Sequence, residues 1–308
     1  MGKIATREAY GKALAKLVVE QDDVVVLDAD LSKSTKTADA KKARPDRHFN
    51  MGIAEGNMMA VAAGLAASGK TVFASSFSIF ATGRAFEQVR NSICYPHLNV
   101  KVCGTHAGIT VGEDGASHQS VEDMACMSAI PGMTVICPAD GIETEQAIYA
   151  VYEHDGPCYV RLGRSAVEDV HPEGYEFEIG KGVVLREGKD IALVACGVMV
   201  QESLKAAKML EEHGLNVTVV NMATIKPVDV ELLVELAKTH KTIYTLEEHN
   251  VIGGLGSMVC QTLAQTVPTK CVCIGMLDSF GESGKPDQLM DKYGLSAEKV
   301  VERILATK

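Results

Sequence analysis

Short runs of β-branched residues alternate along this chain with longer stretches whose apolar residues recur at helical spacing. Such alternation is typical of parallel sheets whose faces are covered by helices. The sequence therefore predicts an α/β fold. The predicted strands are Val24–Asp28, Thr71–Ala74, Asn99–Gly104, Met133–Cys137, Cys158–Arg161, Ile191–Ala195, Asn216–Val220, Thr242–Leu246 and Lys270–Ile274. The predicted helices are Arg7–Val19, Gly56–Ala67, Gly83–Cys94, Val121–Ala129, Ile142–Glu153, Glu202–His213, Val230–Thr239 and Leu255–Ala264.

The alternation is interrupted between residues 166 and 190, where polar residues, Pro172 and several glycines gather. This composition is typical of a linker or a small hairpin between domains. A chain of 308 residues is long enough for two domains with their own cores. We expect a first domain over residues 1–168, a connection over 169–189 and a second domain over 190–308, each a mainly parallel sheet flanked by helices.

Charge and hydropathy exclude several classes of protein. The net charge is −10, and the most basic stretch, residues 41–47, is short and includes Asp46, so a nucleic-acid partner is not expected. No apolar run reaches the length of about 18 residues that a membrane helix needs, and the first residues lack the apolar core of a signal peptide. A cytoplasmic protein without a membrane partner is the expectation.

The nine cysteines do not form a recognised metal or redox motif, because no C-x-x-C pair occurs. Most lie in apolar runs, which favours reduced, buried thiols over a metal site. A metal site built from His106, Asp114 and His118 is also disfavoured, since their spacing matches no common ligand pattern. The sequence thus predicts no metal ligand in this chain.

Glu55 stands at the start of a predicted helix, among small and apolar residues. A carboxylate there can be an ordinary helix cap favoured by the helix dipole. Alternatively, burial in an apolar pocket would raise its pKa and let it share a proton with a ligand. Residue context alone leaves both interpretations open.

Two aromatic residues, Phe77 and Phe80, follow the predicted strand that begins at Thr71. They can belong to the core, or they can hold a flat ring at the strand end. Only 5% of the chain is aromatic, so a close pair beside small residues is a notable candidate.

The densest polar segment covers residues 104–119 and contains His106, Glu113, Asp114 and His118 among several glycines. It follows a predicted strand, and α/β folds bind ligands at the carboxyl ends of their strands. Glycines allow close approach to a substrate, while the His and acidic side chains can transfer protons. This segment is the strongest candidate site in the sequence. A second turn, residues 250–257, resembles a phosphate-binding loop but lacks the full glycine pattern, so close helix packing is favoured there.

In order and spacing, these segments together resemble the transketolase family over nearly the whole chain. The matching motifs, besides the site residues above, are Thr6-Arg7, Asp28-Ala-Asp30-Leu-Ser-Lys-Ser34, Pro138-Ala-Asp140-Gly141, Thr224-Ile-Lys-Pro227, Leu246-Glu-Glu248-His249 and Ser283-Gly-Lys285-Pro286. The resemblance implies a pyrimidine-binding domain followed by the family's C-terminal domain. It also implies a thiamine diphosphate enzyme of carbohydrate metabolism in the pentose phosphate pathway, which transfers a two-carbon unit from a ketose phosphate to an aldose phosphate.

The family also uses an earlier domain that holds the cofactor's diphosphate and Mg²⁺ through a Gly-Asp-Gly motif, and that motif is absent from this sequence. The resemblance therefore implies a split enzyme with a separate N-terminal, diphosphate-binding subunit that supplies the Mg²⁺ ligands. Because the family's sites lie across a dimer interface, a heterotetramer with two copies of each subunit is expected.

The resemblance also assigns roles to single residues. Glu55 is expected to hydrogen-bond the aminopyrimidine and take part in catalysis, Phe77 and Phe80 to line its pocket, and His106 to assist at the reacting hydroxyls. Five further residues are expected to contact the substrate, namely Arg7, Ser34, Asp114, His118 and Arg164. His118 is also expected to contact the cofactor. Arg161 is an alternative to Arg164 as phosphate ligand, since a guanidinium fork suits phosphate in either position.

Two departures from the family pattern are visible: one additional residue near Gly83, and Gly56 after the glutamate, where several members have His or an aromatic residue. The nearest rival functions are a 2-oxo acid dehydrogenase β subunit and part of a deoxyxylulose phosphate synthase. A non-catalytic assembly subunit is the rival from another class. The implied phosphate clamp of Arg7, Ser34 and Arg164 favours phosphorylated sugars over 2-oxo acids.

Overall fold

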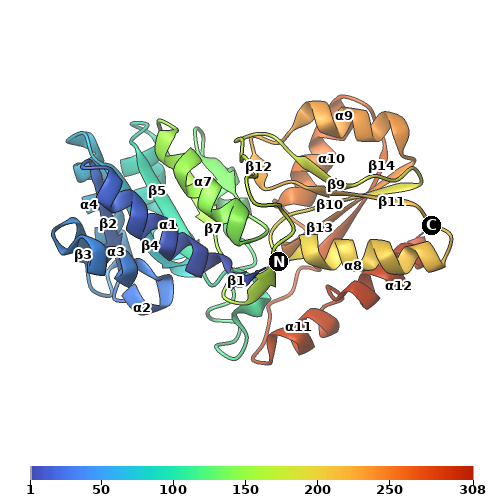
Figure 1. Cartoon of the computed structure of the whole chain (residues 1–308), viewed down its shortest axis with the longest axis horizontal. Coiled ribbons are helices and arrows are strands. Elements are labelled where there is room, and N and C mark those ends of the chain that lie inside the picture. The colour runs from blue at the N-terminus through green and yellow to red at the C-terminus, as the bar shows by residue number, and fades with distance from the viewer. Residues whose placement is uncertain (1, 308) are drawn as a thin grey trace.

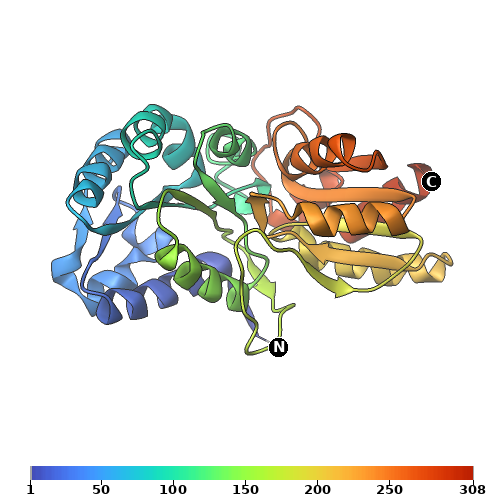
Figure 2. The same cartoon turned by 90° about the horizontal axis from the view of Figure 1, so that it is seen from above.

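The computed structural model describes residues 2–307 and consists of two α/β units side by side, with the first residues of the chain near the junction (Figures 1 and 2). The α/β class predicted from the sequence is confirmed. The first unit is built on a seven-stranded sheet and the second on a five-stranded sheet. A two-stranded antiparallel sheet, β1 (Lys3–Ala5) with β8 (Ala166–Glu168), accompanies them.

The first sheet has the strand order β12-β6-β7-β5-β4-β2-β3 and is parallel except for β12. Its strands are β2 (Val24–Asp28), β3 (His48–Asn50), β4 (Thr71–Phe77), β5 (Val100–Thr105), β6 (Thr134–Ile136), β7 (Cys158–Arg161) and β12 (Thr224–Lys226). The helices of this part are α1 (Thr6–Glu20), α2 (Ser32–Thr35), α3 (Thr37–Ala43), α4 (Glu55–Ala67), α5 (Phe86–Gln88), α6 (Asp123–Ser128) and α7 (Gly141–Glu153), with 3₁₀ turns η1 (Pro45–Arg47) and η4 (Ile109–Val111).

Alternate residues of this sheet enter different cores, as expected for strands buried on both faces. Val24 and Val26 of β2 pack with Leu14 of α1 and Ile148 of α7, whereas Val25 and Leu27 pack on the side of α4. Figure 2 shows the sheet between these two helical layers.

The second sheet has the order β14-β13-β10-β11-β9, with β9 antiparallel to β11 and the other pairs parallel. Its elements are β9 (Val183–Arg186), β10 (Ile191–Ala195), β11 (Val217–Asn221), β13 (Thr242–Asn250), β14 (Lys270–Met276), α8 (Met199–Glu212), α9 (Val230–Thr239), α10 (Leu255–Gln265), α11 (Pro286–Lys292) and α12 (Ala297–Thr307). β9 pairs with β11, so the connection predicted as a linker or small hairpin supplies an edge strand of this sheet.

The predicted helix Gly83–Cys94 is wrong in its geometry. Two π-helical segments, η2 (Phe80–Arg84) and η3 (Val89–Cys94), flank the single turn α5. A π-turn takes up one residue more than an α-helical turn, which fits the additional residue near Gly83.

The two units share one apolar core cluster and one strand. The cluster that contains Val25 and Met58 of the first unit continues to Val194 and Leu255 of the second. β12, which follows β11 in the sequence, pairs antiparallel with β6 and extends the first sheet. The chain thus crosses back from its second unit to complete the sheet of its first.

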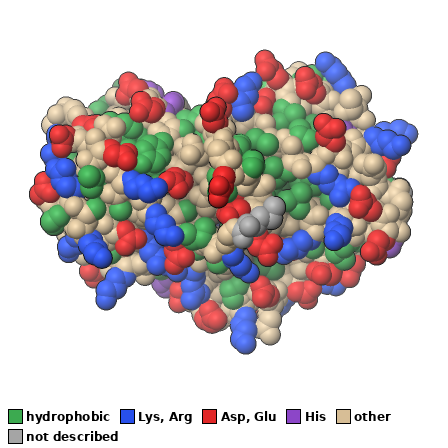
Figure 3. All heavy atoms as spheres, viewed as in Figure 1, with side chains coloured by type: hydrophobic (Ala, Val, Ile, Leu, Met, Phe, Trp, Pro, Cys, Tyr) green, Lys and Arg blue, Asp and Glu red, His purple; other side chains and the backbone are tan. Residues whose placement is uncertain are grey.

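Acidic and basic side chains are interspersed on the face of the molecule drawn in Figure 3. Among residues 2–307, no helix combines the length and apolar character needed to cross a membrane.

Candidate functional site

The predicted site residues gather where the parallel strands of the first sheet end. Phe77 is the last residue of β4, His106 follows β5, and Glu55 begins α4. Ligands bind at this edge in α/β folds because the loops that leave neighbouring strands meet there. The topology therefore brings together residues that lie more than 50 positions apart in the sequence.

Four aromatic rings form one cluster at this edge. Phe77 stacks on His106 with ring centroids 3.9 Å apart, and the Phe77 and Phe80 rings are nearly parallel at 6.0 Å. His118 meets both phenylalanines edge-on, at 6.1 Å from Phe77 and 5.4 Å from Phe80. The structure thus brings together four of the residues predicted from the sequence.

Glu55 is buried at the start of α4, with 2% of its surface exposed, and it does not act as the N-cap, which is Ala54. Its Oε2 atom accepts a hydrogen bond of 2.9 Å from Nη1 of Arg84. The guanidinium carbon of Arg84 lies 4.6 Å from the centre of the Phe80 ring, within the range of a cation–π contact. Arg84 therefore links the buried carboxylate to the aromatic cluster, a contact that the sequence did not reveal because it depends on the π-helical winding of η2.

Arg7 and Ser34 are also brought to the cluster. Nη1 of Arg7 donates to the Ser34 carbonyl oxygen at 2.8 Å and lies 3.5 Å from Nε2 of His106. A guanidinium group can only donate, so Nε2 of His106 accepts, and the ring proton lies on Nδ1, which donates to Thr105 Oγ1 at 2.9 Å. Nε of Arg7 is buried and has no hydrogen-bond partner in the described part of the chain.

His106 is held neutral by its surroundings. Burial, and then the positive charges of Arg7 and Arg164, lower the pKa of His106 to about 3. Its backbone has φ +57°, which is uncommon outside glycine. A neutral imidazole with its proton on Nδ1 can accept a hydrogen bond at Nε2.

The structure separates the two candidate phosphate ligands. Arg161 is buried and bonded to Asp123 through Nε at 2.8 Å, whereas Arg164 is part-exposed and contacts the Val111 carbonyl oxygen and the Glu113 carboxylate, the latter at 3.2 Å. The charge of Arg161 is neutralised inside the protein, whereas the guanidinium of Arg164 stays part-exposed.

Two predicted residues lie in the loop between η4 and α6. His118 belongs to the aromatic cluster and is hydrogen-bonded to Ser117 Oγ at 3.0 Å. Asp114 is exposed, and in residues 2–307 no hydrogen bond or ion pair joins it to the other predicted site residues. The structure therefore does not bring Asp114 into the cluster.

A buried polar network beneath this loop was missed in the sequence. Asp123 accepts hydrogen bonds from Arg161 and, at 2.6 Å, from Tyr159, and Arg161 also donates to the Glu248 carbonyl oxygen at 2.9 Å. Burial opposes ionisation of Asp123, but the Arg161 charge, the nearby His249 and the hydrogen bonds from Arg161 and Tyr159 together outweigh it and lower the pKa of Asp123. The Glu248 carboxylate accepts from Thr110 N at 2.5 Å. This network holds the loop between η4 and α6 in place at the junction of the two units. In the sequence, the Leu246–His249 motif was the feature that pointed to this network.

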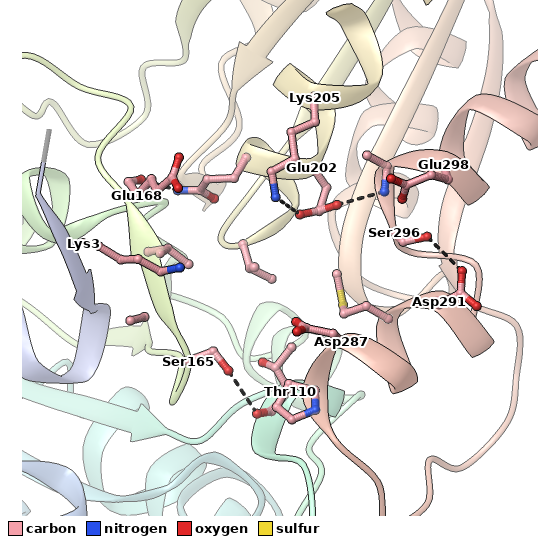
Figure 4. Close-up of a pocket in the computed structure, with 17 residues that line it drawn as sticks. Lys3, Thr110, Ser165, Glu168, Glu202, Lys205, Asp287, Asp291, Ser296 and Glu298 are labelled. Carbon is pink, nitrogen blue, oxygen red and sulfur yellow. Dashed lines mark hydrogen bonds and ion pairs between the residues drawn. The ribbon is translucent and has the colours of Figure 1, made fainter. Parts of the chain in front are cut away.

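A separate pocket lies between the two units and contains none of the predicted site residues (Figure 4). Lys3 and Ser165 border it on one side, and Glu202, Lys205 and Asp287 on the other. Lys205 donates to Glu202 at 2.7 Å, so part of its charge is neutralised within the wall.

Comparisons with known proteins identify the two domains of this chain. Residues 2–169 match the model of the transketolase pyrimidine binding domain, and residues 180–300 match that of the transketolase C-terminal domain. A Methanocaldococcus jannaschii protein named for the C-terminal section of transketolase is 49% identical over 97% of this chain and 95% of its own length. Human transketolase is 35% identical over 98% of this chain, which covers 49% of that protein.

A solved structure described as a split-gene transketolase, an inactive β4 tetramer, superposes with a TM-score of 0.92. It shares 54% sequence identity, and the match covers 98% of both chains. The three kinds of comparison agree. The two domain models together span most of the chain, and the relatives above 30% identity match nearly the whole of this chain. The chain belongs to the transketolase family, as a subunit that consists of the pyrimidine-binding and C-terminal domains.

Proposed function

We propose that this chain is the catalytic half of a two-subunit transketolase that transfers a two-carbon ketol unit from a ketose phosphate to an aldose phosphate. Membership of the family implies dependence on thiamine diphosphate. The observation that carries the proposal is the placement of the buried Glu55 carboxylate beside the Phe77, Phe80, His106 and His118 rings, at the carboxyl edge of the first sheet.

The residues present fit the aminopyrimidine end of the cofactor. Phe77 and Phe80 offer parallel ring faces suited to a flat heterocycle. Glu55 is a single buried carboxyl group that can hold a proton against a ring nitrogen. When bound, thiamine diphosphate supplies the electron sink that lets a carbon–carbon bond next to a carbonyl break.

This chain's own groups bind and orient the sugar. Nε2 of His106 can accept a hydrogen bond from a substrate hydroxyl, because its ring is neutral and its other nitrogen is fixed by Thr105. Arg7 has an unused buried donor, and Arg164 is part-exposed nearby, so both can bind phosphate oxygens. Ser34 and His118 border the same region, and Asp114 is proposed to reach a substrate hydroxyl from its loop.

The diphosphate and Mg²⁺ are assigned to a partner subunit. Mg²⁺ needs oxygen ligands such as carboxylates and phosphates, and the sequence contains no Gly-Asp-Gly motif. The proposed assembly is a heterotetramer with two copies of each subunit. We propose that it acts in the cytoplasm, in the pentose phosphate pathway.

The test is transfer of a two-carbon unit from xylulose 5-phosphate to ribose 5-phosphate, with thiamine diphosphate and Mg²⁺ present. We expect no activity from the chain alone and activity when a diphosphate-binding transketolase subunit is added. Activity of the chain alone would contradict the need for a partner. Turnover of pyruvate without ketose turnover by the assembled complex would contradict the reaction and favour a 2-oxo acid dehydrogenase.

A further inference from the structure

Three of the nine cysteines meet in the second domain, away from the site described above. Cys260 lies on α10, and Cys271 and Cys273 lie two residues apart on the edge strand β14, so that both face the same side of the sheet. The Sγ atoms of Cys260 and Cys273 are 3.7 Å apart, and all three sulfurs lie within 4.8 Å of one another. All three residues are half-buried.

This spacing matches the ligand geometry of a thiolate-bound metal. Bonds of about 2.3 Å from metal to sulfur place two sulfurs about 3.8 Å apart in a tetrahedral site and about 4.0 Å apart in a trigonal one. The three sulfurs therefore need only small movements to bind one ion. No sequence pattern indicated this cluster, because ten residues separate Cys260 from Cys271 and one separates Cys271 from Cys273, and the three come together only when α10 packs on β14.

A buried hydroxyl group lies beside the three-cysteine cluster. Thr245 on β13 is fully buried, and its Oγ1 has no hydrogen-bond partner among residues 2–307. A Cβ atom on Gly256 would lie 2.7 Å from Cys273 Sγ and 2.8 Å from Thr245 Oγ1, so the hydroxyl lies close to that sulfur. Thr245 therefore places a buried polar group at the edge of the three-cysteine cluster, beside Cys273.

We infer that Cys260, Cys271 and Cys273 form a binding site for one thiophilic metal ion of the zinc class, distinct from the Mg²⁺ that serves the cofactor. Soft thiolate ligands select such ions over Mg²⁺. On binding, the metal forms three metal–sulfur bonds, and the thiol protons still present are released to solvent. The site joins a helix to the edge strand of the second sheet, so its role is to fasten that edge.

The first test is titration of the reduced, full-length chain with Cd²⁺, followed by the ultraviolet thiolate-to-cadmium absorption band. We expect saturation at one ion per chain. Replacement of any one cysteine of the three by serine should lower the affinity by more than about 100-fold, since loss of a group that merely supports a ligand already costs about 10- to 100-fold. Cys126→Ser is the matched control, because Cys126 is also half-buried but lies on α6, outside the cluster; it should leave the titration unchanged.

A second measurement uses the unsubstituted chain and so does not depend on the variants folding. One equivalent of Cd²⁺ should protect Cys260, Cys271 and Cys273, and not Cys126, from alkylation, as located by peptide mapping. Protection spread over other cysteines, or a band that survives all three substitutions, would overturn the site. A Cys260–Cys273 disulfide in the untreated chain, with no protection by Cd²⁺ after reduction, would show a redox role and overturn metal binding.

Discussion

Glu55 is buried, and its side chain accepts a hydrogen bond from the guanidinium of Arg84, which also covers the Phe80 ring. A ligand that places a ring nitrogen against Glu55 must share or displace this contact. The Glu55 carboxylate is therefore positioned by Arg84, whose side chain is half-exposed and is not enclosed by the core.

The substitution Glu55→Gln tests this group. An amide keeps the shape but cannot hold the exchangeable proton, so turnover by the assembled complex should fall by about 100- to 10,000-fold. Two-carbon transfer measures the loss. Glu87→Gln, on the exposed turn α5, is the matched control and should retain full activity. Unchanged turnover in the Glu55 variant would favour a non-catalytic role for the chain.

His106 predicts a pH dependence of stability. Its pKa is about 3 in the folded chain and about 6.5 when unfolded, so between these values the unfolded chain binds a proton that the folded chain does not. Stability is therefore lost as the pH falls from about 6.5 towards 3. Burial lowers the pKa of His249 to about 4, which acts in the same direction.

The variant His106→Asn, chosen because asparagine tolerates a positive φ, should lose less stability over this range than the unsubstituted chain. The urea midpoint measured at pH 7 and pH 5 gives the comparison. His213→Asn is the control, since His213 is exposed at the end of α8. Equal losses in the His106 variant and the unsubstituted chain would show that His106 is not buried in its neutral form.

At the scale of elements, strand β12 holds the first sheet and α6 together. Lys226, its last residue, donates from Nζ to the carbonyl oxygens of Ser128 and Ile130 at 2.9 and 2.7 Å. These atoms lie at the end of α6 and just beyond it, where helix carbonyl groups lack partners within the helix.

Lys226→Met should destabilise the chain by about 1–3 kcal/mol, because two carbonyl groups lose their donor. Hydrogen exchange should rise first in β6 and β12. Lys181→Met removes an exposed ion pair with Glu231 and serves as control; exchange in β6 should be unaffected. Faster exchange spread evenly over both sheets would argue against a local role for Lys226.

The elements also show what sequence patterns can and cannot predict. β2, β7, β10 and α9 have the predicted bounds, because their apolar patterns report burial directly. β12 was missed since three residues carry no pattern, and its partner β6 lies about 90 positions earlier. The π-helical winding that aims Arg84 at Glu55 was missed because a period of 3.6 residues was assumed.

The candidate site shows the same division. Phe77, Phe80, His106 and His118 could be predicted, since each lies at the end of a strand or in the segment that follows one, and the structure brings their rings together. Arg164 was predicted as the phosphate ligand with Arg161 as the alternative, and the pairing of Arg161 with the buried Asp123 could not be predicted, because it depends on packing. The cysteine cluster required the packing of α10 on β14.

At the scale of the whole molecule, several large apolar side chains are exposed. Phe280 is 82% exposed, and Ile252 and Leu277, which follow the ends of the adjacent strands β13 and β14, are 62% and 61% exposed. Exposed apolar groups that lie close together mark contact surfaces. We expect this end of the second domain to take part in self-association.

Phe280→Asp should lower the mass of the free chain in analytical ultracentrifugation, because a charge cannot be buried in such a contact without a partner. Val19→Asp is the control, since Val19 is exposed on α1 of the other domain. An unchanged mass in the Phe280 variant, or the same decrease in both variants, would exclude a specific contact at Phe280.

The crossing of β12 into the first sheet limits how this chain can be divided or recombined. A fragment that ended in the connection after residue 169 would contain the pyrimidine-binding domain by sequence, yet it would leave the hydrogen-bonding edge of β6 open to pair with other chains. An exchange of C-terminal domains between relatives would likewise have to bring a compatible strand. The two domains are separate in their sequence patterns, but the pairing of β12 with β6 makes them one structural unit.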